Sequence, residues 1–301
     1  MAPFLARREQ FTIVGSTNDV VRGWLAAGIP EVCLAVADEQ TAGRGREGRA
    51  WVAPAGGALL LSLGFQPTWI APDRVWRLAA VVSLAMAGAA EEVAGLPDGT
   101  IRLKWPNDLV VEQAGESSGE WLAGVPPSTS GGPGAAQRSG VRKLAGVLGE
   151  TDGLGGPDPR AIIGMGLNTD WAAHAFPPEL AGSMTSLREI SQGGAIDHAA
   201  LLDAFLSRLE VGIEALRADR FNESAWADRQ LTTGREVELI APDGAVTTVR
   251  ALGVDGTTGA LVVEDGGAVS GRRQVLVGEI RHVRLPAMAE AAAASPARAG
   301  V

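Results

Sequence analysis

The residues best suited to chemistry lie between positions 43 and 51, where three glycines and three arginines alternate ahead of a tryptophan. The whole chain has a formal net charge of −9, so this segment is a positive island on an acidic protein. Glycine lets a backbone approach a ligand closely, and arginine binds phosphate or carboxylate through paired N–H donors. Trp51 adds a flat ring that can cover a base. The segment therefore predicts a binding site for a nucleotide or another phosphorylated small molecule.

Two other interpretations of this segment have to be weighed. Gly43, Gly45 and Gly48 spell the G-x-G-x-x-G fingerprint of dinucleotide-binding proteins, which has meaning only where it opens a helix. Here Pro54 and the apolar run 58–65 follow, which indicates a buried strand, and the Gly-Lys-Ser/Thr ending of a P-loop is missing. The second alternative, a solvated loop without a ligand, stays open on this segment alone.

A short polar segment precedes the first predicted helix. Ser16-Thr17-Asn18 stand directly before a helix whose apolar face is formed by residues 20, 21, 24 and 25. Ser16 or Thr17 is a natural N-cap. A helix N-terminus with two hydroxyls is also a polar binding site, and the two roles are compatible.

Two further candidates lie at strand ends. Strand 101–104 runs into Trp105-Pro106-Asn107-Asp108, where Asp108 is a candidate Mg²⁺ ligand, although an Asn-Asp pair by itself indicates only a turn. Lys143 opens strand 143–150, either as a solvated surface charge or as a cation that points into a cleft.

Strand 160–168 carries the last candidates. Gly164 and Gly166 permit close approach of a ligand or a neighbouring backbone. Asn168, at the end of the strand, could read an amide or a base edge.

Composition excludes several classes of protein. The calculated pI near 5.0 argues against a dedicated DNA-binding protein, because such a domain is usually basic over a whole face. The single cysteine, Cys33, allows no disulfide within the chain, which fits a reducing compartment. The arginines at positions 7 and 8 are not followed by the apolar segment of a signal peptide, and no apolar run is long enough to cross a membrane. We therefore expect a cytoplasmic enzyme or binding protein that binds neither nucleic acid nor membranes.

The elements that must position these residues form two groups. Up to about residue 230, apolar runs predict strands and two long amphipathic helices, one opened by Pro72 and Asp73 and one capped by Asp197. From residue 235 the pattern changes to short strands separated by Asp-Gly turns, which indicates a small β-barrel or meander. The predicted strands are 32–37, 58–65, 101–104, 109–111, 143–150, 160–168, 237–240, 246–252, 260–263, 274–277 and 279–284.

These elements predict a ligand-binding catalytic domain over residues 1–230 and a small barrel over residues 231–285. Residues 113–140 are rich in glycine, serine and proline, and we expect them to form a flexible insertion. The alanine-rich residues 286–301 are expected to be a disordered tail.

Four of the segments described above resemble the biotin protein ligase family, in the same order. They are Ser16-Thr17-Asn18, Gln40-Thr41-Ala42-Gly43-Arg44-Gly45-Arg46-x-Gly48-Arg49-x-Trp51, Lys104-Trp105-Pro106-Asn107-Asp108 and Lys143-Leu144-Ala145-Gly146. The resemblance runs from about residue 11 to residue 285. It implies an α+β fold of the class II synthetase-like type, in which a mixed β-sheet flanked by helices is followed by a small C-terminal SH3-like β-barrel.

The resemblance also implies a reaction in two steps. Biotin and ATP would form biotinyl-5′-AMP and pyrophosphate, with Mg²⁺ as the cofactor. A lysine of a biotin carboxyl carrier domain, in an acyl-CoA or pyruvate carboxylase, would then take the biotinyl group. In this family Ser16, Thr17 and Gln40 would hold the ureido ring of biotin, and Lys143 would bridge the biotin carboxylate and the α-phosphate.

Site residues follow from the same resemblance. The catalytic residues would be Lys143 and Arg46, and the metal ligand would be Asp108. The biotin site would consist of Ser16, Thr17, Asn18, Gln40, Arg44, Gly45, Arg46, Lys143 and Gly146. The ATP site would consist of Gly43, Arg44, Arg46, Arg49, Trp51, Asn107, Lys143, Gly164 and Asn168, with Trp51 over the adenine and Asn168 at its edge.

The sequence departs from the family pattern at two places. Glu47 stands where some relatives carry another arginine, so a weaker grip on the triphosphate is expected. Only fifteen residues precede Ser16, too few for the winged helix that some members use to bind DNA, so we expect a monofunctional enzyme, either a monomer or a homodimer. Two alternatives stay open: a lipoate–protein ligase, which the Gly-Arg run with Trp51 disfavours, and a non-catalytic biotin-binding sensor, which the intact Arg46 and Lys143 disfavour.

Overall fold

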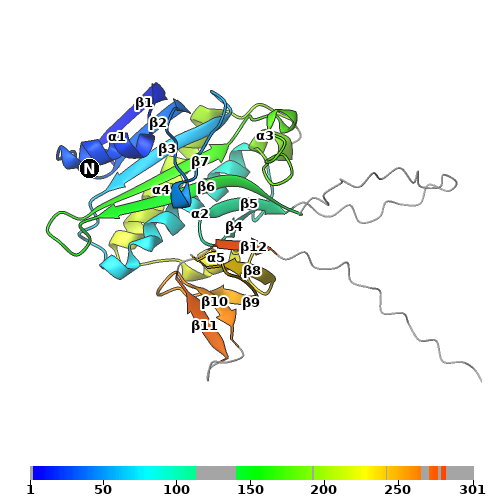
Figure 1. Ribbon diagram of the computed structural model, residues 1–301. Helices are drawn as coiled ribbons and strands as arrows, with labels where there is room; N and C mark the ends of the chain where they lie inside the picture. Colours follow the sequence, from blue (N-terminus) through cyan, green and yellow to red (C-terminus); the bar gives the residue numbers. More distant parts are fainter. Residues whose placement is uncertain are drawn as a thin grey trace, which may run out of the picture.

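The computed structural model in Figure 1 describes residues 3–112, 140–191, 193–241, 243–265, 271–276 and 279–282. Within these ranges a large sheet carries helices on both faces, and a smaller second sheet lies at one end of it (Figure 1). Apart from its last residue, the predicted insertion at 113–140 lies outside the described residues, as does the predicted tail at 286–301. The mixed sheet, its flanking helices and the small second sheet confirm the predicted α+β fold class.

The central sheet has seven strands in the order β1-β2-β3-β7-β6-β5-β4. β1 and β2 are parallel, and every other neighbouring pair is antiparallel, so the sheet is mixed. In chain order its strands are β1 (Arg7–Val14), β2 (Cys33–Gln40), β3 (Ala58–Phe65), β4 (Ile101–Lys104), β5 (Asp108–Glu112), β6 (Val141–Asp152) and β7 (Arg160–Asn168). β3 and β7 are buried along almost their whole length because helices cover both faces of the sheet, which explains their continuous apolar sequences.

β1 is a strand of this sheet that the sequence analysis does not predict. It lies at the edge, where β2 is its only partner among the described strands, and it mixes half-buried with exposed residues. Its first four residues are Arg7-Arg8-Glu9-Gln10. Charged residues protect an exposed strand edge against pairing with another chain, and the same residues hide the strand from a search for apolar runs.

The helices lie on opposite faces of the sheet. α1 (Thr17–Ala26) packs on β2, β3 and β7, while α2 (Trp76–Val93) covers the other face with α4 (His198–Arg217) alongside it (Figure 1). α4 begins as predicted, because the Asp197 carboxylate accepts hydrogen bonds from the N–H groups of Ala199 and Ala200. α2 begins at Trp76 and not at Pro72, because a separate 3₁₀ turn, η2 (Pro72–Arg74), comes first. The shorter elements are η1 (Arg46–Gly48), η3 (Ala173–Ala175), α3 (Leu187–Ile190) and α5 (Glu223–Asp228).

The second sheet contains five antiparallel strands in the order β11-β10-β9-β8-β12. They are β8 (Glu236–Ile240), β9 (Val246–Val254), β10 (Leu261–Glu264), β11 (Arg272–Val275) and β12 (Glu279–His282). Each predicted C-terminal strand therefore has an observed counterpart, with ends displaced by one or two residues. The small antiparallel sheet confirms this part of the fold, whereas its closure into an SH3-like barrel and the domain boundary after residue 230 stay predictions.

Trp105 joins the two sheets. This residue belongs to the turn between β4 and β5, yet its side chain is 4% exposed and packs in the apolar core of the second sheet with Val237, Leu261 and Val263. Its indole N–H donates a hydrogen bond to the carbonyl of Gly259, 3.1 Å away. The β4–β5 turn is thereby fixed against the second sheet.

Candidate active site

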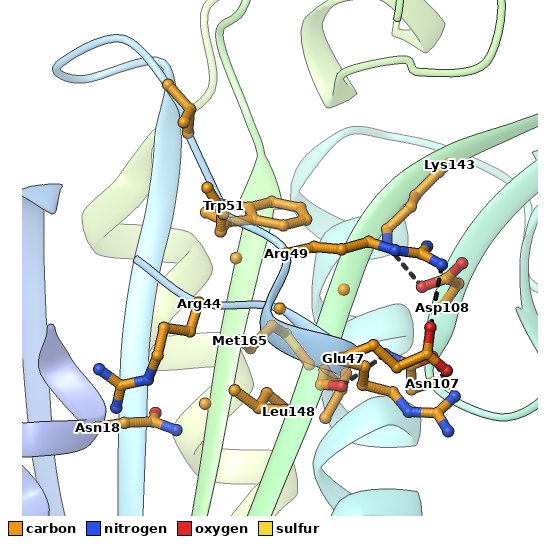
Figure 2. Close-up of a pocket in the computed structure, with 18 of the residues that line it drawn as sticks. Asn18, Arg44, Glu47, Arg49, Trp51, Asn107, Asp108, Lys143, Leu148 and Met165 are labelled. Atoms are coloured by element: carbon orange, nitrogen blue, oxygen red, sulfur yellow. Dashed lines mark hydrogen bonds and ion pairs between the residues drawn. The ribbon is translucent and has the colours of Figure 1, made fainter. Parts of the chain in front are cut away.

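The predicted site residues converge on one cavity of about 380 Å³, shown in Figure 2. Its walls come from the segment 43–51, which we call the glycine-rich loop, from the start of α1, from the β4–β5 turn and from β6 and β7. The predicted residues that line it are Ser16, Thr17, Asn18, Gln40, Arg44, Gly45, Arg46, Arg49, Trp51, Asn107, Asp108, Lys143, Gly146 and Gly164. Gly43 and Asn168 are the predicted residues that do not line it.

The glycine-rich loop folds back on itself. The N–H of Trp51 donates to the carbonyl of Gly43 at 2.9 Å, and the N–H of Gly45 donates to the carbonyl of Arg49 at 2.7 Å. A Cβ atom on Gly43 would lie 2.5 Å from the Trp51 carbonyl oxygen, so only glycine fits at the neck of the loop. Gly43 thus closes the loop and stays outside the cavity. No α-helix follows, as predicted, and the tip of the loop is the 3₁₀ turn η1.

Trp51 lies on a floor made of two glycines. A Cβ atom on Gly166 or Gly146 would lie 2.3 Å or 3.0 Å from its indole, so the ring fits only because neither strand carries a side chain at these positions. The ammonium of Lys143 lies 5.4 Å from the ring centroid, within the range of a cation–π contact. The indole N–H is buried without a hydrogen-bond partner. The loop, the two strands and Lys143 are therefore held together through one ring.

Lys143 and Asp108 form an ion pair at the cationic end of the cavity. The ammonium nitrogen lies 2.6 Å from a carboxylate oxygen, and the two side chains are 29% and 18% exposed. Figure 2 shows Arg49, Trp51, Lys143 and Asp108 together at one side of the cavity. Lys143 thus points into the cavity, as one of its two sequence interpretations predicted.

Asp108 is the predicted Mg²⁺ ligand, and its surroundings fit that role in part. The described residues contain no group of three or more His, Cys, Asp or Glu side chains arranged to hold a metal ion. Mg²⁺ in nucleotide enzymes is commonly held by one or two carboxylates together with substrate phosphates, so a single carboxylate beside the cationic residues is sufficient. The amide of Asn107 is already engaged, since it receives a hydrogen bond from Arg46 and donates one to the carbonyl of Val147.

The opposite end of the cavity is polar and largely uncharged. The Gln40 side-chain oxygen accepts hydrogen bonds from the N–H and the hydroxyl of Thr17, at 2.8 and 3.0 Å. Asn18 lies over Gly164, where a Cβ would come within 2.2 Å of the Asn18 side-chain oxygen. The absence of a side chain at position 164 thus leaves room for Asn18. Ser16 occupies the N-cap position of α1, but its side chain makes no capping hydrogen bond, contrary to the expected capping role.

Ser62 and Glu150 join this polar end, although the sequence analysis does not single them out. The Ser62 hydroxyl lies 2.7 Å from the Thr17 hydroxyl and 2.5 Å from the Asn18 side-chain oxygen, and Glu150 accepts a hydrogen bond from the Asn18 amide at 2.5 Å. A signal for Ser62 does exist in the sequence. It is the one polar side chain in the apolar run of β3.

Arg44 points away from the anion-binding end. Its guanidinium donates two hydrogen bonds to the carboxylate of Asp19 on α1, at 2.8 and 2.6 Å. The hydrogen bond from Arg44 lowers the pKa of Asp19, and the same hydrogen bond raises the pKa of Arg44. In this structure the Arg44 side chain therefore tethers the glycine-rich loop to α1.

Asn168 is fully buried and does not reach the cavity. Its amide N–H donates to the carbonyl of Thr185 at 3.0 Å, and its side-chain oxygen has no hydrogen-bond partner. Contact with an adenine edge would require the segment around Thr185 to move. The predicted adenine contact of Asn168 consequently gains no support from this geometry.

The structure thus brings the cationic glycine-rich loop and a largely uncharged polar end together in one cavity on a mixed sheet. Residues 11–168 match the model of the Biotin/lipoate A/B protein ligase family, and the chain belongs to this family. One relative is the biotin–[acetyl-CoA-carboxylase] ligase of Mycobacterium tuberculosis, which is 31% identical over 90% of this chain and 86% of its own length. The resemblance inferred from the four sequence segments is thereby confirmed.

Other comparisons agree with this assignment. The bifunctional ligase/repressor BirA of Bacillus subtilis is 26% identical over 84% of this chain and 67% of its own length. The fold is also that of the biotin protein ligase from Aquifex aeolicus in complex with biotin and ATP, with a TM-score of 0.68 and 24% identity over 92% of this chain and 99% of that one. Among the described residues, no helix is both long enough and apolar enough to span a membrane.

Proposed function

We propose that the chain is an ATP-dependent biotin protein ligase, which forms biotinyl-5′-AMP and transfers the biotinyl group to a lysine of a biotin carboxyl carrier domain. The observation that carries the proposal is the division of one cavity into two ends. Thr17, Asn18 and Gln40 supply neutral hydrogen-bonding groups at one end, and Arg46 and Lys143 supply positive charge at the other. Biotin adenylate has the same division, with a neutral ureido ring at one end and a phosphate at the other.

The first step joins two anions. A carboxylate oxygen of biotin bonds to the α-phosphorus of ATP, the bond between the α-phosphorus and the bridging oxygen breaks, and pyrophosphate leaves. Catalysis of such a step depends on positioned positive charge that neutralises charge on the transferring group. Lys143 is suited to lie between the two anions, because it lines the cavity near the start of β6, and Arg46 approaches from the loop. Mg²⁺, held by Asp108 and phosphate oxygens, would neutralise the triphosphate.

The second step is acyl transfer. The uncharged amine of the carrier lysine attacks the carbonyl carbon of the adenylate, an amide bond forms, and AMP leaves with the electrons of the broken C–O bond. A mixed anhydride of this kind is hydrolysed by water, so exclusion of water from the cavity matters. We infer that the glycine-rich loop, which is tethered through Arg44 and seated through Trp51, provides this cover.

Lipoate is the main alternative substrate, and the polar end of the cavity argues against it. The dithiolane ring of lipoate has no N–H or carbonyl group. It could neither donate to nor accept from the polar groups of Thr17, Asn18 and Gln40, and a polar group that a ligand buries without a partner costs roughly 1–3 kcal/mol. A cyclic urea can satisfy both donors and acceptors there. We also infer a cytoplasmic location, since ATP is available there and Cys33 is a buried free thiol.

The test is a pyrophosphate-exchange assay with either biotin or lipoate, followed by mass spectrometry of a carrier domain incubated with the protein, ATP and Mg²⁺. We expect biotin-dependent exchange and addition of one biotinyl group to the carrier. Exchange that requires lipoate would identify a lipoate ligase. Biotin binding without exchange or transfer would identify a sensor.

A further inference from the structure

Glu150 is the end of a chain of polar contacts, buried in its middle and partly buried at its two ends, that reaches the predicted ureido site. The chain runs from Glu150 to Asn18, Ser62, Thr17 and Gln40, with contacts of 2.5, 2.5, 2.7 and 3.0 Å. Asn18, Thr17 and Gln40 line the cavity, whereas Glu150 and Ser62 do not line it. Ser62, Thr17 and Asn18 are at most 5% exposed, so water does not substitute freely for a missing partner.

The two ends of the chain fix the orientation of both amides. Glu150 forms an ion pair with Arg22 at 2.9 Å, and a carboxylate only accepts hydrogen bonds. Asn18 must therefore turn its NH₂ group to Glu150 and its oxygen to Ser62. At the other end the N–H of Thr17 donates to Gln40, so the Gln40 oxygen must face Thr17.

A count of protons then shows that the chain is short of one donor. Ser62 and Thr17 each have a single hydroxyl proton, but three oxygen–oxygen contacts join Asn18, Ser62, Thr17 and Gln40. One of the three contacts therefore has no proton between its two oxygen atoms, so an oxygen of the chain can accept a further donor. An N–H group of a ligand can supply it, and a cyclic urea carries two such groups.

We propose that Glu150 and Ser62 are positioning residues, which fix the donor and acceptor pattern that Thr17 and Asn18 present to the ligand. The inference rests on the proposed function, because it takes the ureido ring of biotin as the ligand of this end. Replacement of Glu150 by glutamine keeps the shape but allows Asn18 to turn its NH₂ group toward Ser62. In that orientation the chain is internally satisfied and no longer needs a donor from the ligand.

The test compares Glu150→Gln and Ser62→Ala with the wild type in biotin-dependent pyrophosphate exchange, with KM measured separately for biotin and for ATP. Asp152→Asn is the matched control, since Asp152 is an exposed carboxylate two residues further along β6. We expect about a tenfold or larger rise in KM for biotin in both variants, with KM for ATP within about twofold of the wild type. The control should match the wild type in both constants.

A double variant separates positioning from general loosening of the fold. If both residues act through one chain, Glu150→Gln with Ser62→Ala should raise KM for biotin little more than the stronger single variant. An unchanged KM for biotin in folded Glu150→Gln, or a parallel rise in KM for ATP, overturns the inference. If Ser62→Ala does not fold, the isosteric Glu150→Gln decides alone. A wild-type protein without biotin-dependent exchange would refute the proposed function instead.

Discussion

The ion pair between Lys143 and Asp108 allows catalysis and stability to be separated in one set of variants. Lys143→Met removes the ammonium but retains an unbranched side chain that can lie on Trp51. We expect it to abolish most biotin-dependent exchange, because the ammonium is the group placed to touch both reacting anions. Loss of one such contact costs about 3–5 kcal/mol, which corresponds to a rate reduced by between about 10² and 10⁴.

The same substitution leaves Asp108 without its partner. An exposed ion pair contributes about 0–1 kcal/mol, and breaking a buried one costs about 3–5 kcal/mol. Lys143 and Asp108 are 29% and 18% exposed, so we place the loss near the lower part of this range, at about 1–2 kcal/mol. For a chain of this size that lowers Tm by roughly 2–3 °C.

Asp108→Ala combined with Lys143→Met should restore much of the lost Tm, because no unpaired carboxylate remains, and it should restore none of the exchange activity. The measurements are pyrophosphate exchange and a thermal melt for both single variants and the double variant. Exchange close to the wild-type rate in a folded Lys143→Met protein would show that the ammonium is a surface charge and would refute the mechanism.

Three further predictions concern the glycine-rich loop and its anchors. Gly166→Ala places a methyl group 2.3 Å from the Trp51 indole, so it should raise KM for ATP and increase hydrogen–deuterium exchange of the backbone amides in the loop. Gly149→Ala on β6 is the control, because its Cβ would lie 3.6 Å from its nearest neighbour, and it should change neither quantity. Trypsin should cut after the loop arginines rapidly in the free protein and much more slowly with biotin, ATP and Mg²⁺, because the phosphate groups form ion pairs with these arginines. Equal cleavage rates in the two states would contradict loop closure. The pKa of Asp19 is lowered from 3.8 on folding, so its pair with Arg44 stabilises the protein above that pH and loses its effect as the pH falls through the folded value. The Tm difference between wild type and Asp19→Asn should therefore shrink in acid, and a constant difference would contradict this.

Local sequence patterns predict the parts of the fold that depend on local chemistry. β3 and β7 follow from continuous apolar runs, and the start of α4 follows from Asp197, because burial and capping are properties of neighbouring residues. β1 escapes prediction because an edge strand keeps charged side chains. Whether it forms a strand is decided by β2, which lies about twenty-five residues away in the register.

The site residues also fall into two groups, those that local sequence patterns predict and those that they do not. The glycine-rich loop and Lys143 stand in recognisable segments, so the sequence predicts their place in one cavity. Ser62 and Glu150 are polar residues on β3 and β6, and their contacts to Asn18 span 44 and 132 positions. Nothing near them in the chain indicates those partners. Only the order of strands in the sheet brings them together.

The burial of Trp105 in the second sheet has a consequence for a chain that is still being synthesised. The residues that enclose this indole come from β8, β9, β10 and β11, which leave the ribosome more than a hundred residues after Trp105 itself. Until then Trp105 lacks its apolar packing, and the β4–β5 turn, which carries Asn107 and Asp108, is held to β6 through Asn107 and Val147. A nascent chain can thus complete its large sheet and its glycine-rich loop while the turn opposite the loop is less firmly held. We therefore expect the proposed adenylation to reach its full rate only after the last strands have folded, which limits the release of a reactive anhydride by an unfinished chain.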